Sequence, residues 1–270
     1  MESQARRLLA VIMKTTPAVL IALLAGCGSS PTGNSTNVGD NPVDSIAKEF
    51  KVIADIPPPP GFKRVVADSG SFGYWLRQIS LKKDKTVYLY DGSLKRRQGV
   101  QYAVMNISVG NRDLQQCADA VMRIRADYLF AMKRYNDIRF WDNAGKLYAW
   151  NGTNDRTAFD KYLINVFAWC GSASLEKQLK AVPDNYKINP GDVLIKGGFP
   201  GHAMIVVDVV MNSKGQRKFM LAQSYMPAQD IHVVKNPLDP GEGPWYDMDK
   251  TMEDISTPEW TFYWDQLRTW

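Results

Sequence analysis

Residues 202–224 decide the fold that the sequence predicts. They read His-Ala-Met-Ile-Val-Val-Asp-Val-Val-Met-Asn-Ser-Lys-Gly-Gln-Arg-Lys-Phe-Met-Leu-Ala-Gln-Ser. Residues 203–210 and 218–224 are rich in β-forming side chains, and Asn212-Ser-Lys-Gly215 between them is a turn sequence. We therefore expect an antiparallel hairpin in which paired positions sum to about 427. Met204 then lies opposite Gln223, and Gln223 becomes the same-face diagonal neighbour of His202.

The flanking sequence predicts helices before this hairpin and strands around it. Apolar residues at three- and four-residue spacings indicate a long helix from about 113 to 135, with Asp113 as its N-cap. We expect further helices after Ser71 and over 155–169 and 172–179, and further strands over 86–90, 102–107, 193–196 and 231–235. Helices followed by an antiparallel meander indicate the α+β class.

Composition excludes several classes of protein. The chain has 270 residues, of which 45% are hydrophobic and 23% charged, so disorder does not describe the bulk of it. Its 33 basic and 28 acidic residues form no concentrated basic block, so we expect no nucleic-acid partner. Two histidines and three cysteines are too few for a zinc cluster or a dense disulfide scaffold, and we expect neither metal nor cofactor.

The N-terminus has the pattern of an export signal. Basic residues precede an uncharged apolar run that is too short to span a membrane comfortably, and the run ends in Leu24-Ala25-Gly26-Cys27, which resembles the bacterial lipobox. We therefore expect a lipoprotein signal peptide over 1–26, a lipid on Cys27, a flexible polar tether over 27–43 and one domain over 44–270. Gly28 follows the acylated position and favours the outer membrane of the cell envelope.

Three residues have the chemistry of a thiol hydrolase. Cys117 falls in the first turn of the long helix, where free amides and the helix dipole stabilise a thiolate. His202 opens the hairpin directly after the glycine-rich turn Gly197-Gly-Phe-Pro-Gly201. In the hairpin register above, the Gln223 amide accepts a hydrogen bond from one imidazole nitrogen, leaving the other to face the thiol.

Other interpretations of these residues stay open. Cys117 lies on the apolar stripe of its helix and fits a structural thiol, and in an exported protein a disulfide with Cys170 is a further alternative. Our prediction is that both are unbonded, with Cys170 the weaker nucleophile candidate. His232 alternates with apolar neighbours and fits a surface histidine, while Asp208 is about 20 Å along the strand from His202 and too far to orient it. The aromatic residues of 245–264 fit either a sugar platform or a core.

Several motifs resemble known families. Gly191-Asp-Val-Leu-Ile, a glycine loop and Gly201-His-Ala-Met-Ile-Val-Val are similar to the papain-like cell-wall hydrolases of NlpC and CHAP type. That resemblance implies a papain-like α+β fold, with N-terminal helices packed on a small antiparallel sheet, and the site order Cys117, His202, Gln223. The Gly61-Phe62 segment, 113–120, 196–202 and 221–230 also resemble an uncharacterised bacterial lipoprotein family, domain of unknown function 4846.

The combined prediction is a membrane-anchored, exported lipoprotein with a Cys-His amidase or peptidase site. The expected substrates are amides of peptidoglycan peptides, attacked by Cys117 with His202 as base and Gln223 as its orienting residue. Gln115 or Gln116 is a candidate further donor to the oxyanion. The alternative is a non-enzymatic surface lipoprotein, a binding module that keeps a silent hydrolase-like site.

Overall fold

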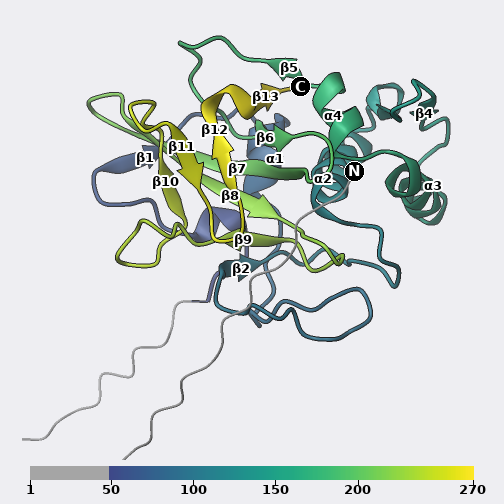
Figure 1. The fold of residues 1–270 in the computed structure, drawn as a ribbon, viewed down its shortest axis with the longest axis horizontal. Coiled ribbons are helices and arrows are strands. Elements are labelled where there is room, and N and C mark those ends of the chain that lie inside the picture. The colour runs from purple at the N-terminus through teal and green to yellow at the C-terminus, as the bar shows by residue number, and fades with distance from the viewer. Residues whose placement is uncertain (1–48) are drawn as a thin grey trace, which may run out of the picture. The chain divides into compact units, whose positions relative to one another are not determined.

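The expected hairpin lies at the centre of a large sheet. The computed structural model describes residues 49–270, and the predicted signal peptide, tether and Cys27 lie outside them. A nine-stranded sheet has the order β2-β9-β8-β7-β6-β13-β5, with β1 and β10 also paired to β7 and β8, and these pairings are antiparallel (Figure 1). The hairpin is therefore buried among other strands rather than standing at a sheet edge.

The elements have the following bounds. The helices are α1 (Phe72–Arg77), α2 (Cys117–Ala131), α3 (Arg156–Trp169) and α4 (Ser172–Gln178). The strands of the large sheet are β1 (Phe62–Arg64), β2 (Gln101–Val104), β5 (Lys180–Ala181), β6 (Val193–Lys196), β7 (His202–Asn212), β8 (Arg217–Gln223), β9 (His232–Val234), β10 (Trp245–Asp247) and β13 (Leu267–Thr269). Two small hairpins pair β3 (Arg139–Trp141) with β4 (Leu147–Ala149) and β11 (Asp254–Ser256) with β12 (Thr261–Tyr263).

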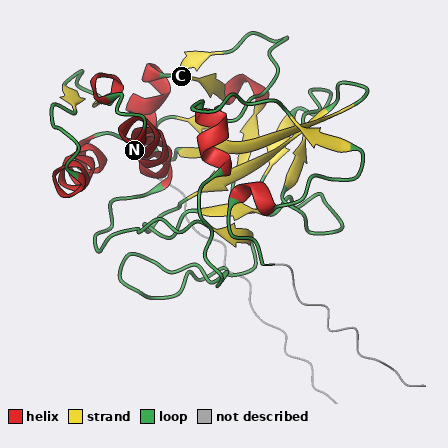
Figure 2. Cartoon of the chain, turned by 180° about the vertical axis from the view of Figure 1, so that it is seen from behind, coloured by secondary structure: helices red, strands yellow, loops and turns green. Residues whose placement is uncertain are grey.

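Both faces of the sheet are covered. Ile205 and Val207 of β7 belong to the apolar core shared with the helices, while Met204 and Val206 point to a second core that includes Phe262 of β12. This alternation follows from the two-residue period of a strand. The β11–β12 hairpin lies in front of the sheet in Figure 1, and α1 lies in front of it when it is seen from behind in Figure 2, with α2, α3 and α4 beside one end of the sheet. Each site residue on β7 or β8 is thus enclosed by one of two layers.

The expected papain-like fold class is wrong. In place of helices on a small sheet, the described residues form a nine-stranded antiparallel sheet with four helices, of which α1 and α4 have only 6 and 7 residues. The sheet is larger than expected because four further strands, β1, β5, β10 and β13, extend or flank it. Each of these strands has only two or three residues. Strands that short carry no readable alternation of apolar and polar side chains.

The predicted elements agree with the structure in part. The helices over 155–169 and 172–179 are confirmed as α3 and α4, and Ser71 caps α1 by accepting the Tyr74 N–H. The long helix begins at Cys117 rather than 113, because the Asp113 carboxylate accepts the Ala228 N–H at 2.7 Å instead of capping it. Residues 86–90 form isolated bridges and a tight turn in place of the expected strand.

The predicted hairpin is confirmed, and its register contains two compensating shifts. The turn places three residues between Asn212 and Gln216, which gives pairs such as Met211 with Arg217. A bulge between Val206 and Asp208 then moves the pairing by one residue, so that Ile205 lies opposite Ala222. Near His202 the pairing is therefore the one that the sequence predicts, although the turn is not.

Asp208 has a structural environment. Its carboxylate, fully buried, accepts hydrogen bonds from Arg64 Nε and Arg77 Nε at 2.7 Å each. The two arginines also donate to backbone carbonyls, and they connect β1 and α1 to β7. A buried carboxylate that is paired in this way stabilises the junction of three elements, and it plays no part in the site around His202.

Candidate functional site

The three predicted site residues stand at the ends of adjacent elements. Cys117 is the first residue of α2, His202 the first of β7 and Gln223 the last of β8. The Ala203 N–H, directly after His202, donates to the Cys117 sulfur, so the thiol lies beside the start of β7. The loop before His202 is tight, since a Cβ on Gly201 would lie 2.5 Å from the Gly198 carbonyl oxygen.

The imidazole of His202 has a defined hydrogen-bond polarity. Its Nε2 lies 2.7 Å from Gln223 Oε1, and because an amide oxygen only accepts, Nε2 carries the proton. Its Nδ1 is buried and has no partner among residues 49–270. The ring therefore holds a free lone pair on Nδ1, which is the atom that a general base needs.

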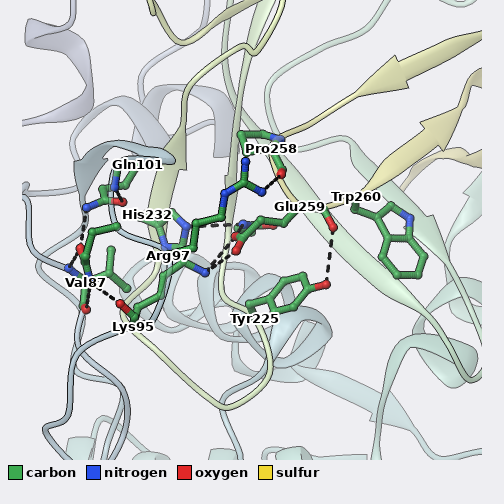
Figure 3. Close-up of polar contacts among 12 residues, drawn as sticks. Val87, Lys95, Arg97, Gln101, Tyr225, His232, Pro258, Glu259 and Trp260 are labelled. Carbon is green, nitrogen blue, oxygen red and sulfur yellow. Dashed lines mark hydrogen bonds and ion pairs between the residues drawn. The ribbon is translucent and has the colours of Figure 1, made fainter. Parts of the chain in front are cut away.

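The orientation of the Gln223 amide is fixed by Glu259. The Gln223 amide nitrogen donates to Glu259 Oε2 at 2.9 Å, and it lies 3.4 Å from His232 Nε2. The carboxylate in turn accepts from Lys95 Nζ at 2.7 and 2.9 Å (Figure 3). Since a carboxylate cannot donate, it holds the amide nitrogen on its own side and leaves the amide oxygen for His202.

The second histidine completes this network. His232 Nδ1 donates to the Asp230 carbonyl oxygen at 2.8 Å, which leaves its Nε2 to accept from the Gln223 amide. His232 is fully buried because β9 lies between β2 and β8, so the expectation of a surface histidine is wrong. Lys95, Glu259, Gln223 and the two imidazoles thus form one polar chain, in which Glu259 accepts from both Lys95 and Gln223 and the Gln223 oxygen accepts from His202.

The thiol of Cys117 is protonated at neutral pH. Burial raises its pKa to about 11, with a smaller contribution in the same direction from the Asp119 charge. The N–H groups of Ala203, Ala118 and Cys117 act in the opposite direction, as the helix-start position predicts. Burial outweighs them, so the expected resting thiolate is wrong. Burial also raises the pKa of the Asp119 carboxyl well above its ordinary value.

The imidazole of His202 is neutral in the same range. Burial lowers its pKa to about 4, partly offset by the hydrogen bond to Gln223. Its ring is enclosed by Tyr225, Trp260 and Phe262, whose centroids lie 5.0, 5.4 and 5.8 Å away. At rest, Cys117 is therefore a thiol and His202 a neutral imidazole.

The other residues singled out from the sequence, apart from His232, lie in the core or bond to their neighbours. Cys170 is buried at the end of α3, burial raises its pKa to about 12, and it is not bonded to Cys117, as predicted. Gln116 donates to Asp113, while Gln115 is buried and has an unpartnered amide nitrogen. Trp245, Tyr246 and Phe262 are buried, which favours the core interpretation of the aromatic cluster.

Sequence reasoning missed Glu259 and Lys95. Each lies in a loop far along the chain from its partner, and the contact requires the fold of the second layer over the sheet. The sequence contains one signal for Glu259. Trp260 and Phe262 alternate as the apolar residues of a strand do, and Glu259 directly precedes them, so it packs over β7 and β8 with the same segment.

The described residues contain no candidate metal site and no candidate membrane-spanning helix. Across 49–270, no group of three or more histidine, cysteine or acidic side chains could hold a metal ion. In the same residues no helix is both long and apolar enough to cross a membrane.

Comparison with known proteins gives a family but no assigned activity. No curated protein and no solved structure is significantly similar to the chain, and the NlpC and CHAP resemblance stays a prediction. Residues 52–154 and 148–269 match the family described as a domain of unknown function (4846), which covers most of the chain. The protein belongs to the DUF4846 family.

Proposed function

We propose that Cys117 and His202 form the thiol–imidazole pair of an amide hydrolase. The observation that carries this proposal is the polarity of His202, with Nε2–H bound to Gln223 at 2.7 Å and a buried Nδ1 that has no partner within the described part of the chain. A structural histidine has no need of an empty acceptor in the core, because an unsatisfied buried nitrogen costs about 1–3 kcal/mol. A general base, in contrast, requires an imidazole nitrogen whose lone pair is free to accept a proton.

The proposed chemistry begins from the neutral pair. As the Cys117 sulfur attacks the amide carbon, its proton passes to His202 Nδ1, and a tetrahedral oxyanion forms. The N–H groups at the start of α2 are the nearest donors for that oxyanion. The C–N bond then breaks, His202 returns the proton to the leaving amine, and water hydrolyses the thioester. Burial holds the pKa of His202 near 4, so substrate contacts must favour the imidazolium during the reaction.

The proposed setting is the bacterial cell envelope. Leu24-Ala25-Gly26-Cys27 supports export and lipidation at Cys27, and an exported amide hydrolase held on a membrane meets peptidoglycan peptides. The class of substrate we propose is therefore the peptide amide of cell-wall fragments. Expression of Cys27→Ser tests the anchor: we expect the protein to leave the membrane fraction, and an unchanged distribution would contradict the anchor.

A binding module with a silent site is the second candidate. The observation that favours it is burial, since Cys117 is 6% exposed and His202 is fully enclosed. A substrate must then displace part of the aromatic wall around His202 to meet the sulfur. Reaction with iodoacetamide does not separate the two candidates, because a thiol with a raised pKa reacts slowly in either case.

Turnover separates them. We expect release of free amines from purified peptidoglycan peptides by the wild type, none by Cys117→Ala, and a reduced rate for Gln223→Ala, since an orienting residue contributes less than the nucleophile. Cys170→Ala is the matched control, because it removes an equally buried thiol at the end of a different helix, α3, and should retain activity. Equal amine release by wild type and Cys117→Ala would reject the hydrolase.

A further inference from the structure

A cavity adjoins the polar chain on the side of Glu259. Its walls come from the loop 89–97, from residues 225–229 and from Glu259. Tyr225 is part of this wall and also packs on His202, with ring centroids 5.0 Å apart. Tyr225 therefore borders both the cavity and the imidazole.

The cavity has an excess of positive charge. Its lining contains three cationic side chains, Lys95, Arg96 and Arg97, and one carboxylate, Glu259. Lys95 is paired with Glu259, and within residues 49–270 neither arginine forms an ion pair with a carboxylate. Arg97 donates to the Pro258 carbonyl oxygen (Figure 3). Two uncompensated guanidinium groups attract an anion and favour planar, bidentate ones.

A buried donor in the same wall has no partner. Gln229 is 2% exposed, and its amide nitrogen makes no hydrogen bond with the part of the chain that the structure describes. An unsatisfied buried donor is costly, and a bound acceptor removes the cost. The arginines are donors that suit a carboxylate, and Gln229 adds to the same wall a side chain whose amide nitrogen lacks a partner within the described residues.

The rim of the cavity is apolar. Leu94 is 59% exposed and Met226 is 40% exposed, and both line it. Exposed apolar side chains beside a cationic pocket favour a ligand that has an aliphatic part next to its charge. A short peptide that ends in a free carboxylate has this character.

We infer that this cavity binds the free carboxylate of a short peptide. The proposal deepens the proposed function, because a peptide held there extends past Tyr225 toward His202 and Cys117. The substrates would then be peptides in which a free carboxylate lies near the scissile amide. Amidation of that carboxylate removes its charge and should weaken binding.

Binding to a variant that cannot turn over tests the inference. The full-length chain with Cys117→Ala is titrated by calorimetry with N-acetyl-Ala-Ala as the free acid and as the C-terminal amide. We expect the acid to bind about tenfold more tightly, the size of one charge-assisted hydrogen bond. Arg96→Gln should reduce this preference about threefold, in the range of an exposed ion pair, and Arg96→Gln with Arg97→Gln should abolish it.

Arg96 and Arg112 make a matched pair of variants. Both are exposed, and Arg112 lines a different cavity, so Arg112→Gln removes the same charge and should keep the preference. Equal affinities for acid and amide, no binding of either at millimolar concentration, or a preference that survives the double substitution would overturn the inference. Binding with the expected preference, combined with a wild type that releases no amine, would keep the carboxylate site and reject the hydrolase alone.

Discussion

Glu259→Gln should reverse the polarity of the chain that orients His202. In the wild type Lys95 Nζ lies 2.7 and 2.9 Å from the two carboxylate oxygens, and Gln223 donates to one of them. A glutamine at 259 has one oxygen and one NH2 group in those places. The NH2 would lie 2.7 Å from the ammonium in the place of Oε1 and 2.9 Å from it in the place of Oε2, which faces Gln223. The oxygen should therefore take the closer place beside Lys95, and the NH2 should face Gln223.

The Gln223 amide then has to rotate by half a turn. Its oxygen accepts from residue 259, its NH2 faces His202 Nε2, and the imidazole proton moves to Nδ1, where it blocks the base. The 3.4 Å contact with His232 opposes the rotation, but it is long and neutral. A hydrogen bond to a charged group contributes about 1.5–3 kcal/mol, so the productive tautomer falls about 10- to 100-fold, and kcat should fall by the same factor.

Imidazole 15N NMR reads this change without any substrate. The chain contains two histidines, and the wild type should show one Nε2–H ring, His202, and one Nδ1–H ring, His232. In Glu259→Gln both rings should be Nδ1–H. A His202 ring that keeps Nε2–H in this variant would refute the reasoning.

Two further variants separate polarity from simple damage to the fold. Glu259→Gln leaves a buried ammonium unpaired, at a cost of about 3–5 kcal/mol, so lost activity alone is ambiguous. Adding Lys95→Met frees residue 259 to turn its oxygen toward Gln223, and we expect the Nε2–H tautomer and part of the activity to return. Glu253→Gln, at an exposed acid, is the charge-matched control and should change nothing.

Three other outcomes are expected. Burial lowers the pKa of His232 from 6.5 to about 4, so the unfolded chain binds one more proton than the folded chain as the pH falls below 6.5. His232→Gln should therefore reduce the slope of the unfolding free energy against pH, measured in urea, by about 1.4 kcal/mol per pH unit between pH 6.5 and 4. An unchanged slope would contradict the lowered pKa. Asp208→Asn leaves Arg64 and Arg77 without a counter-charge and should cost about 3–5 kcal/mol in chemical denaturation, whereas a cost under 1 kcal/mol would show that the arginines find other partners. Cys117 should react with iodoacetamide at pH 7.5 about 100-fold more slowly than free cysteine, because burial raises its pKa to about 11; a rate near that of free cysteine would place the thiol in solvent.

The sequence predicted the position of Gln223 beside His202 better than it predicted the fold class. Helix caps such as Ser71, together with the long apolar runs of β6 to β8, are local signals, and those elements were found. The sheet's short outer strands depend on pairing with residues far along the chain, so no local pattern identifies them. The fold class was wrong for that reason, although the two strands that carry His202 and Gln223 were predicted.

The correct placement of Gln223 beside His202 depends on two shifts that cancel. A three-residue loop with Gly215 at positive φ moves the hairpin register by one residue from the expected value. The bulge near Val207 moves it back before the strands reach His202. Neither feature has a sequence signal strong enough to predict, whereas burial of one apolar face constrains the sum of the two. Patterning therefore predicted the end of the hairpin better than its turn.

Stability alone does not explain the buried pair of Lys95 and Glu259. Their side chains are 6% and 11% exposed, and replacing such a pair by apolar residues of similar volume is often neutral or stabilising. A hydrocarbon in place of Glu259 would leave the Gln223 amide free to present either end to His202. The ammonium has a separate effect, since it lies 2.7 Å from Glu259 and compensates its buried negative charge. A paired carboxylate is thus the group that accepts from the Gln223 amide nitrogen and cannot donate to the amide oxygen, and this requirement accounts for two charges in an otherwise aromatic wall.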